Sequence, residues 1–521
     1  MPLPRPLRAL ALCSFLAAAP PTAAAQLPPL TVPKGQLRID FGGRFDDWDQ
    51  RFLNGTRQEA AADFNRNPVD ASWLPGLSFA ESQLRLVTGM DALTLSLGAS
   101  SATTLANVGT TSLGAALGLT NRLTIFGTVP FVRVRVRVSL HLDSTSATAG
   151  FNPADPAFGS PAGASQTGAF ITQLDAALTT LAERLQSGAY DSDPARKAMA
   201  QALFVKGANL EDLFVGATFL PVAGTTGAAA LTASIESLRS GLASTDSTIS
   251  GITGDPALPS ARLGPADFEG YTTNPQGPIA GRPFTPPLLT YLGDIEVGAA
   301  FAWLDHRPPH GQRGGFTARS VLQGTVRLRT GKLDRPDAFF DLPTGDRQPD
   351  VQGDLVTDLA AGPIGARFTA RYVLQLPGRQ VRRITPPDLP FADASTTALV
   401  VRDPGEIMEG AIEPFIRIGP TIALVGGVRH WAKGIDKFTY AAGQAPIEGT
   451  TPDVLAIGTK ENGTAVSAGL SFVHDGVRKD GTIGLPMDAS LRWEMVEASS
   501  EGRVPIKQSV TISLRFYKKI F

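Results

Sequence analysis

The chain has 521 residues and a near-neutral composition, with 47 lysine and arginine residues against 48 aspartate and glutamate residues. This length suits one large barrel or two to three ordinary domains, and the charge balance argues against nucleic acid as a partner. The one cysteine, Cys13, lies in an N-terminal segment that we expect to be removed. The mature chain is therefore expected to have no disulfide, catalytic thiolate or cysteine metal site.

The first 25 residues have the pattern of a secretory signal peptide. Arg5 and Arg8 precede a short apolar run at 10–19, and Ala23–Ala25 provide small side chains before Gln26. Cleavage near Ala25 leaves 45 basic and 48 acidic residues, a net charge of −3. No segment reaches the roughly 18 uncharged apolar residues of a transmembrane helix. If the mature chain spans a membrane, it must form a closed barrel, because closure alone leaves no strand edge unpaired.

Residues 26–83 are expected to form an N-terminal segment before the barrel. A proline-rich leader at 26–34 precedes a possible short strand at 35–45. Residues 46–81 are polar and irregular, with scattered aromatic side chains. Two interpretations of this stretch stay open, namely a plug in the barrel lumen and a periplasmic tail.

The clearest strand signal lies in residues 121–143. From Val132 to Leu142 the even positions are valine or leucine, whereas Arg133, Arg135 and Arg137 occupy odd positions. A β-strand places these two sets on opposite faces. A soluble sandwich would bury the aliphatic face, whereas a membrane barrel would turn it toward lipid and the arginines toward a wet lumen. We predict the membrane arrangement. As an alternative, the arginines meet anionic surface lipid, because they lie toward the outer end of a long strand.

Twelve strands are predicted, with 14 as the alternative count. They lie near 84–98, 106–118, 122–142, 293–305, 315–330, 353–362, 365–376, 410–418, 421–431, 463–474, 485–497 and 507–517. The connections between them alternate between short and long, which is typical of outer-membrane barrels and has no reason to occur in a soluble sandwich. The predicted fold class is all-β, a transmembrane antiparallel β-barrel over residues 84–521 with its C-terminus in the periplasm.

The longest connection, residues 143–292, is predicted to be a partly helical extracellular insertion. Apolar side chains recur at helical spacing in 168–187, 193–205 and 228–242, and proline and glycine make 252–287 irregular. We expect these helices to cap the barrel mouth or fold into it, and the alternative is a loose surface decoration.

The chain ends at Phe521, a terminal aromatic residue of the kind that the barrel-insertion machinery is expected to bind. The alternation of the last strand slips by one residue around Phe516–Tyr517. This slip predicts that residues 517–521 lie beyond the barrel.

Three short motifs together resemble a known barrel family. They are Gly118–Leu123 with the strand that follows to Val132, Leu292–Gly298, and Phe340–Asp346. The sequence over roughly residues 105–376 is similar to outer-membrane channels related to the FadL long-chain fatty-acid transporter, including the group labelled for the meta-pathway of phenol degradation. The resemblance implies a monomeric barrel that passes small hydrophobic or aromatic compounds and has no catalytic residues. The insertion at 143–292 departs from a compact family member, which leaves substrate and gating open.

Charged residues are frequent on the predicted lumen face. The candidate lumen-lining residues are Arg133, Arg135, Arg137, Arg319, Arg327, Arg329, Arg367, Arg371, Glu413, Arg429, Arg492, Glu494 and Arg515. One interpretation is a basic constriction that favours anionic solutes. The other is an arginine–carboxylate ladder that braces a narrow barrel, and the interleaved acids favour it.

No catalytic, metal or cofactor site is expected. The sequence has neither a G-x-S-x-G elbow nor an H-E-x-x-H motif. His306 and His310 share no helical face, because Pro308 and Pro309 separate them. Acids between Asp334 and Asp350 are more consistent with a solvated loop than with a cation site.

We expect passive uptake of a small, hydrophobic or aromatic solute across the bacterial outer membrane, with membrane lipids and the insertion machinery as partners. Three alternatives are a surface protein that uses 143–292 for adhesion or ligand binding, an outer-membrane hydrolase, and a soluble secreted β-protein.

Overall fold

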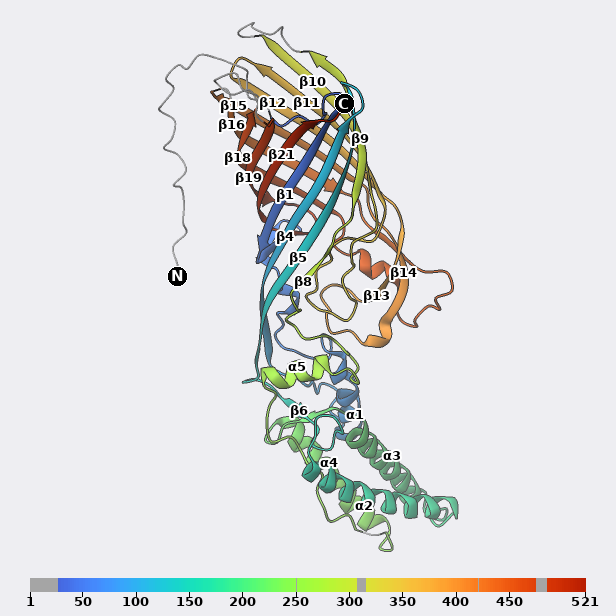
Figure 1. Cartoon of the computed structure of the whole chain (residues 1–521). Helices are drawn as coiled ribbons and strands as arrows, with labels where there is room; N and C mark the ends of the chain where they lie inside the picture. The colour runs from blue at the N-terminus through green and yellow to red at the C-terminus, as the bar shows by residue number, and fades with distance from the viewer. Residues whose placement is uncertain (1–26, 250, 307–314, 420, 475–484) are drawn as a thin grey trace.

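Figure 1 shows an elongated molecule with a β-barrel at one end and a group of helices at the other. The computed structural model describes residues 27–249, 251–306, 315–419, 421–474 and 485–521, so the predicted signal peptide, its cleavage site and His310 lie outside the described residues. The C-terminus lies at the end of the barrel that is farthest from the helices (Figure 1). We call this end of the barrel the turn end and the opposite end the loop end.

Antiparallel strands close into one barrel. In chain order they are β1 (Gln36–Trp48), β4 (Ala99–Gly118), β5 (Leu123–Asp143), β9 (Glu296–His306), β10 (Phe316–Arg327), β11 (Asp350–Ala361), β12 (Ile364–Gln375), β15 (Ile407–Ile418), β16 (Ile422–Lys433), β18 (Glu461–His474), β19 (Met487–Ala498) and β21 (Gln508–Lys519). Each strand pairs with the next in this order, and β21 pairs with β1 to complete the ring. A further strand, β8 (Leu289–Leu292), extends the sheet along β5. The predicted fold class and the count of twelve strands are confirmed.

Side chains alternate between the two faces of the barrel wall, as the strand geometry requires. Every strand of the ring exposes at least one large apolar side chain on its outer face, for example Phe41, Leu113, Ile125, Phe301, Leu322, Leu355, Phe368, Ile412, Leu424, Leu470, Leu491 and Ile512. An apolar belt around the whole circumference is what a lipid environment requires of a barrel. Short connections such as 119–122 and 362–363 lie at the turn end, and the long connections lie at the loop end.

The strands of the ring differ from the predicted set at the N-terminal side. The possible short strand at 35–45 is the full barrel strand β1, which has 13 residues. The strand predicted at 84–98 is wrong, because Ser78–Thr88 forms helix α1 and the residues after it pair with no barrel strand. Leu93, Leu95 and Leu97 do alternate, but they are buried against the helices. Their alternation therefore marks a buried extended segment rather than a membrane strand.

Residues 46–81 lie at the loop end. After β1, the strands β2 (Gln50–Leu53) and β3 (Thr56–Glu59) form a small sheet with β20 (Arg503–Pro505). The 3-10 helices η1 (Ala62–Phe64) and η2 (Pro75–Leu77) then lead into α1. The structure thus places this segment among the long connections, which is neither of the two positions expected from the sequence.

The last strand runs unbroken to Lys519, so the predicted slip at Phe516–Tyr517 does not occur. Phe516 lies on the outer face, where its ring centroid is 6.3 Å from that of Phe41. Tyr517 is buried on the inner face, where its hydroxyl donates a hydrogen bond to Asp488. The reason is that the apolar side chain of Tyr517 fills the lumen at the turn end, so an aromatic residue on the inner face does not break the alternation.

The insertion between β5 and β9 is a folded helical region. It contains α2 (Pro161–Gln186), α3 (Pro194–Gly216), α4 (Thr226–Thr245), α5 (Pro265–Thr273) and the two short strands β6 (Ala149–Phe151) and β7 (Phe219–Pro221). The first three helices overlap the predicted ones, whereas α5 lies in a stretch that was expected to be irregular. Side chains of Ser160, Asp193 and Thr225 accept hydrogen bonds from backbone N–H groups in the first turns of α2, α3 and α4, which favours their N-terminal ends. No helix among the described residues is long and apolar enough to cross a membrane.

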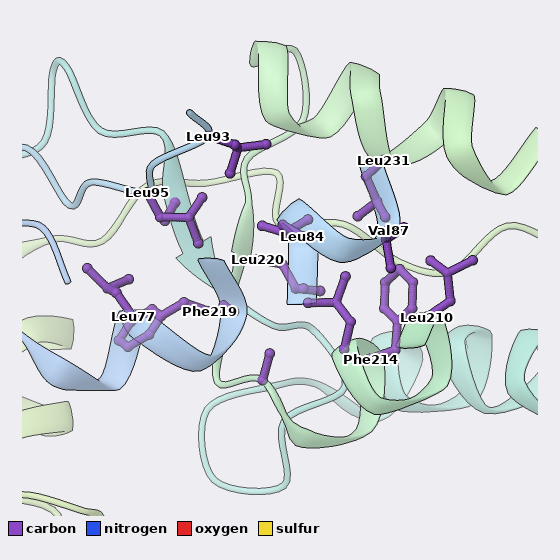
Figure 2. Packing of buried hydrophobic residues seen from close by; sticks show 14 of the residues in the cluster. Leu77, Leu84, Val87, Leu93, Leu95, Leu210, Phe214, Phe219, Leu220 and Leu231 are labelled. Carbon is purple, nitrogen blue, oxygen red and sulfur yellow. The ribbon is translucent and has the colours of Figure 1, made fainter. Parts of the chain in front are cut away.

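The core of this region joins α1 to the insertion. Figure 2 shows Leu84 and Val87 of α1 near Leu210 and Phe214 of α3 and Leu231 of α4. Leu84, Leu210 and Leu231 are completely buried. Segments from both sides of β4 and β5 therefore share one core.

Replacing Leu210 by alanine is expected to destabilise the helical region by about 2–5 kcal/mol, because a buried leucine leaves a cavity. The readout is helical circular dichroism against temperature. The matched control is Val215→Ala, because Val215 lies on the same helix and is 69% exposed. Equal melting of the two variants would contradict the shared core.

A second small sheet lies in the connections at the loop end. It consists of β13 (Gly378–Arg383), β14 (Thr397–Asp403) and β17 (Lys437–Tyr440), with η3 (Ala394–Thr396) and η4 (Pro452–Ala456) beside it. Ile384, Val400 and Phe438 form its core.

Candidate functional site: the barrel lumen and two apolar hollows

A series of ion pairs crosses the inner wall of the barrel. Asp354 on β11 is 2.7 Å from Arg371 on β12, and Arg371 is 3.3 Å from Glu409 on β15. Glu409 is also 3.0 Å from Arg429 on β16. Because the strands are adjacent and all these side chains face inward, the charges alternate in sign from one strand to the next.

The series continues to β19. Arg429 is 2.7 Å from Glu494, and Arg492 lies 3.8 Å from the same carboxylate. Arg492 also pairs with Glu413 on β15, although β16 and β18 separate their strands in the sheet. We call the seven residues Asp354, Arg371, Glu409, Arg429, Glu494, Arg492 and Glu413 the ion-pair ladder. It contains three arginines and four acids, so it carries no excess of positive charge.

A different set of contacts lies across the lumen at the turn end. Residues 27–34 precede β1, and Leu27, Thr31 and Val32 are buried. We call residues 27–34 the N-terminal segment. Leu27 packs against Ala360, Phe415 and Ala423 on one side of the ring.

The other end of the N-terminal segment reaches the far side of the barrel. Val32 packs with Ala116 of β4 and Tyr517 of β21. In the ring, β4 lies opposite β15, the strand of Phe415, and β21 lies opposite β11, the strand of Ala360. Leu30 packs between these two points, against the cluster of Ala300, Ala302 and Val321. The N-terminal segment therefore crosses the lumen from wall to wall.

Arginines of the wall bind this segment. The carbonyl of Pro28 accepts a 3.1 Å hydrogen bond from Arg367, and that of Pro29 accepts a 3.0 Å bond from Arg38. Arg319 donates to the hydroxyl of Thr31. Arg367 is itself paired with Asp358 at 2.6 Å. Because these arginines lie on three strands around the ring, the segment is held from several directions.

The chain turns from the lumen into β1 at Gly35. The residue has φ +74°, and a Cβ atom there would lie 2.2 Å from the carbonyl oxygen of Phe521. Only glycine fits this turn without strain, because the left-handed conformation and the close approach both exclude a side chain.

An apolar cavity of about 450 Å³ lies at the loop end. Residues 282–291 and 332–344 line it, including Leu289, Tyr291, Phe340 and Leu342. The Lys332 ammonium lies 4.2 Å from the centre of the Tyr291 ring. We call this the loop-end cavity, and its volume and mostly apolar lining suit a small organic ligand.

A buried carboxylate anchors one wall of the loop-end cavity. Asp294 accepts backbone hydrogen bonds from Gly331 at 2.7 Å and from Asp346 at 3.1 Å, which lie at the two ends of the cavity loop. Burial, with a contribution from Asp346, raises the pKa of Asp294 above its ordinary value.

A second apolar hollow, of about 740 Å³, lies on the outer face of the wall nearer the turn end. Phe316, Ile364, Pro414, Ile416 and Leu424 are among its lining residues. We call it the wall hollow.

The strand pairing is interrupted at the wall hollow. Ile412 of β15 pairs with Val428 of β16, and Phe415 pairs with Val425, but Glu413 and Pro414 between them have no paired residue on β16. On the other side of β15 they do pair with Arg367 and Ala366 of β12. Proline has no N–H group to donate, and the residues opposite on β16 are Gly426 and Gly427, so few side chains and few hydrogen bonds join β15 to β16 here. Phe415 and Val425 line the wall hollow and also belong to the cluster around Leu27. The wall hollow and the N-terminal segment thus lie on the two sides of the same thin patch.

The structure places most of the candidate lumen residues on the inner face of the wall. These are Arg319, Arg327, Arg367, Arg371, Glu413, Arg429, Arg492, Glu494 and Arg515. Arg329 lies beyond the end of β10 and is exposed.

Arg133, Arg135 and Arg137 require a correction, because they lie on the outer face of β5 and are exposed. Val132, Val134 and Val136 face inward and are buried with Trp48, Phe340 and Leu342. The prediction assumed that the aliphatic face meets lipid. At the loop end it instead meets apolar residues of the long connections, so the arginines turn outward.

Sequence reasoning considered a lumen plug within residues 26–83 and assigned it to 46–81, so it did not single out the N-terminal segment, residues 27–34, as part of the site. The available signal was its three large apolar side chains, Leu27, Leu30 and Val32, in a leader otherwise composed of proline, threonine and lysine. Large apolar side chains are mostly buried in folded proteins, so three of them in eight residues indicate a segment that packs against the protein.

Among the described residues, the histidines and acids considered for catalysis or metal binding lie apart from one another; His310 lies outside those residues. His430 bonds the Thr464 hydroxyl at 3.0 Å on the outer face, and His306 is exposed at the end of β9. In the acidic loop, Asp334 pairs with Arg382 and Asp337 with Arg282. Among the residues that the structure describes, no group of three or more His, Cys, Asp or Glu could hold a metal ion.

Comparison with known proteins finds no matching family model and no matching curated sequence. Among solved structures, an outer membrane channel from Pseudomonas putida F1 is similar with a TM-score of 0.40 and 10% identity, covering 95% of this chain and 99% of that one. A Pseudomonas aeruginosa FadL homologue has a TM-score of 0.24 and 8% identity, with 93% and 90% coverage. The Pseudomonas putida toluene transporter TodX has a TM-score of 0.22 and 11% identity, covering 94% of this chain and 90% of that one. The barrel assignment of this chain rests on its own strand pairing.

Proposed function

We propose that this chain is a channel of the bacterial outer membrane that passes small hydrophobic or aromatic compounds. The observation that supports this function most directly is the thin patch of β15 and β16, where an interruption in strand pairing coincides with the apolar wall hollow. Transfer of a hydrophobic compound from the lumen into water is unfavourable, whereas its transfer into the membrane is favourable. A side route from the lumen into the membrane therefore suits such a compound better than a polar pore does.

Two further features support this route. The loop-end cavity provides an apolar binding place of ligand size at the side that we assign to the cell exterior. Every arginine of the ion-pair ladder is paired with a carboxylate, so the ladder braces the wall without presenting free cations to the solute. We assign the turn end to the periplasm, as in other barrels with short periplasmic turns, and the signal-peptide pattern supports export.

Filling the wall hollow is expected to slow hydrocarbon uptake severalfold. Gly426→Leu adds a side chain in the hollow, where an added Cβ would meet only the ring of Pro414 at 4.0 Å. The measurement is the initial uptake rate of a radiolabelled monoaromatic hydrocarbon by cells that express the protein.

The matched control is Gly410→Leu. Gly410 also faces outward on β15, and nothing lies within 4 Å of its added Cβ, so the same side chain enters the lipid belt away from the hollow. Equal uptake by the two variants, at equal amounts of folded barrel, would contradict the side route.

A further inference from the structure

The outward arginines of β5 have no role in the proposed route and no partner for their charge. Arg133, Arg135 and Arg137 are exposed, and within the described chain their guanidinium groups make no hydrogen bond or ion pair. Alternate residues of a strand are about 6.6 Å apart, so the three cations form a straight row. We call this row the arginine strip.

The arginine strip lies on the part of the sheet that continues past the ring. β4 and β5 have 20 and 21 residues, against 12 in most of the other barrel strands, and Figure 1 shows them continuing toward the helices. β5 pairs with β9 only from Leu123 to Thr128. Its pairing with β8 covers Phe131 to Val134 and goes no farther. Arg135 and Arg137 therefore lie beside an edge of β5 that no strand of the described residues covers.

The row begins where the apolar belt ends. Phe131 lies on the same face of β5, next to Arg133 on the side of the turn end, and is 50% exposed. Phe45 of β1 is 55% exposed, and its ring lies beside Gly109, the β4 residue that pairs with Arg133. A strand tilted by about 40° rises roughly 2.5 Å per residue along the membrane normal, so a belt of about 25 Å takes about ten residues. Counting from Leu123, the belt ends near Arg133, which places the strip at the level of the lipid headgroups.

The surroundings leave the strip positive. Opposite the three arginines, β4 presents Gly109, Asn107 and Leu105, none of them charged. The nearest outward carboxylate at the level of the strip is that of Asp47 on β1. Asp47 pairs with Asn107 of β4, which in turn pairs with Arg135. Farther along the same face of β5 lie His141 and then Asp143.

We propose that the arginine strip binds the phosphate groups of lipids in the outer leaflet, in the form of a diphosphorylated glycolipid. Guanidinium groups bind phosphate in a bidentate way and are only weakly hydrated, so a row of them at headgroup level is complementary to a layer of lipid phosphates. This inference rests on the proposed placement in the outer membrane and not on transport. It also explains why a row of charges can face outward. At headgroup level the arginines avoid the free-energy cost of placing a charge in the hydrocarbon core.

The test is native mass spectrometry of the full mature protein in detergent with purified diphosphorylated lipid A. Each cation near a membrane surface is worth about a fivefold change in binding, so the triple variant R133Q/R135Q/R137Q is expected to bind on the order of 100-fold more weakly. R133K/R135K/R137K should bind with an affinity between those of the wild type and the glutamine variant, because lysine keeps the charge but not the bidentate geometry. The control R122Q/K518Q/K519Q removes three exposed cations at the turn end and should bind as the wild type does.

Three results would overturn the proposal. They are equal binding by the wild type and the glutamine variant, displacement of the lipid by an equal concentration of inorganic phosphate, and a strip-dependent dimer of the protein in place of lipid adducts. Heat-modifiable gel migration shows that each variant is a folded barrel. Hydrocarbon uptake is measured in parallel and should be unchanged, so failure of lipid binding is distinguishable from failure of the proposed channel.

Discussion

Replacing Leu27, Leu30 and Val32 by glycine is expected to open the turn end of the lumen and raise single-channel conductance severalfold. These side chains bury the N-terminal segment against three parts of the wall. Burial of such a side chain contributes about 1.5–3 kcal/mol, and glycine adds backbone freedom, so the remaining hydrogen bonds from Arg38, Arg319 and Arg367 would not hold the segment across the lumen. The measurement is planar-bilayer conductance of the refolded mature protein.

The control for this prediction lies in the same segment. Lys34 is exposed and next to the turn into β1, so Lys34→Gly alters the segment without removing an apolar contact. It should leave conductance at the wild-type level. A triple glycine variant that conducts no more than wild type would show that the segment does not close the lumen.

Replacing Arg429 by methionine is expected to lower the free energy of unfolding by about 2–3 kcal/mol. Arg429 joins Glu409 and Glu494, and its loss leaves two neighbouring carboxylates without their shared cation. Breaking a fully buried pair costs about 3–5 kcal/mol, and the effect is smaller here because the Arg429 side chain is 23% exposed in the lumen. Urea unfolding of the barrel in detergent micelles measures the change.

Two further variants separate charge from packing at this position. Adding E409Q and E494Q to R429M should restore much of the lost stability, because the two glutamines remove the carboxylate charges that lost their shared cation. The exposed arginine control, R379Q, should be neutral, since Arg379 has no side-chain partner among the described residues. If R429M unfolds like R379Q, the ladder does not stabilise the barrel.

The barrel could be predicted because membrane strands follow a simple rule. Residues 485–497 alternate cleanly, and the structure shows Leu491 and Trp493 outside with Asp488 inside. The rule failed where a second apolar environment replaced lipid. Leu93, Leu95 and Leu97 alternate because one face packs on helices, and Val132, Val134 and Val136 alternate because Phe340 and Leu342 cover them from inside.

The candidate site could be predicted only in part, for the same reason. Alternation assigns a residue to a face, so it found the inward arginines of β10, β12, β16 and β19. Alternation does not show which inward acid pairs with which arginine. Glu413 and Arg492, for example, form an ion pair although their strands are not adjacent. Alternation also has no bearing on the N-terminal segment, which has no strand pairing and is positioned by contacts with residues far along the chain.

We propose that the barrel passes hydrophobic compounds by a side route and does not pass hydrophilic ones through an open pore. The most direct measurement compares uptake of a labelled monoaromatic hydrocarbon and of a hydrophilic solute of equal size by cells with and without the protein. We expect the protein to speed uptake of the hydrocarbon alone. Faster uptake of the hydrophilic solute with unchanged hydrocarbon uptake would contradict it and indicate an open aqueous pore.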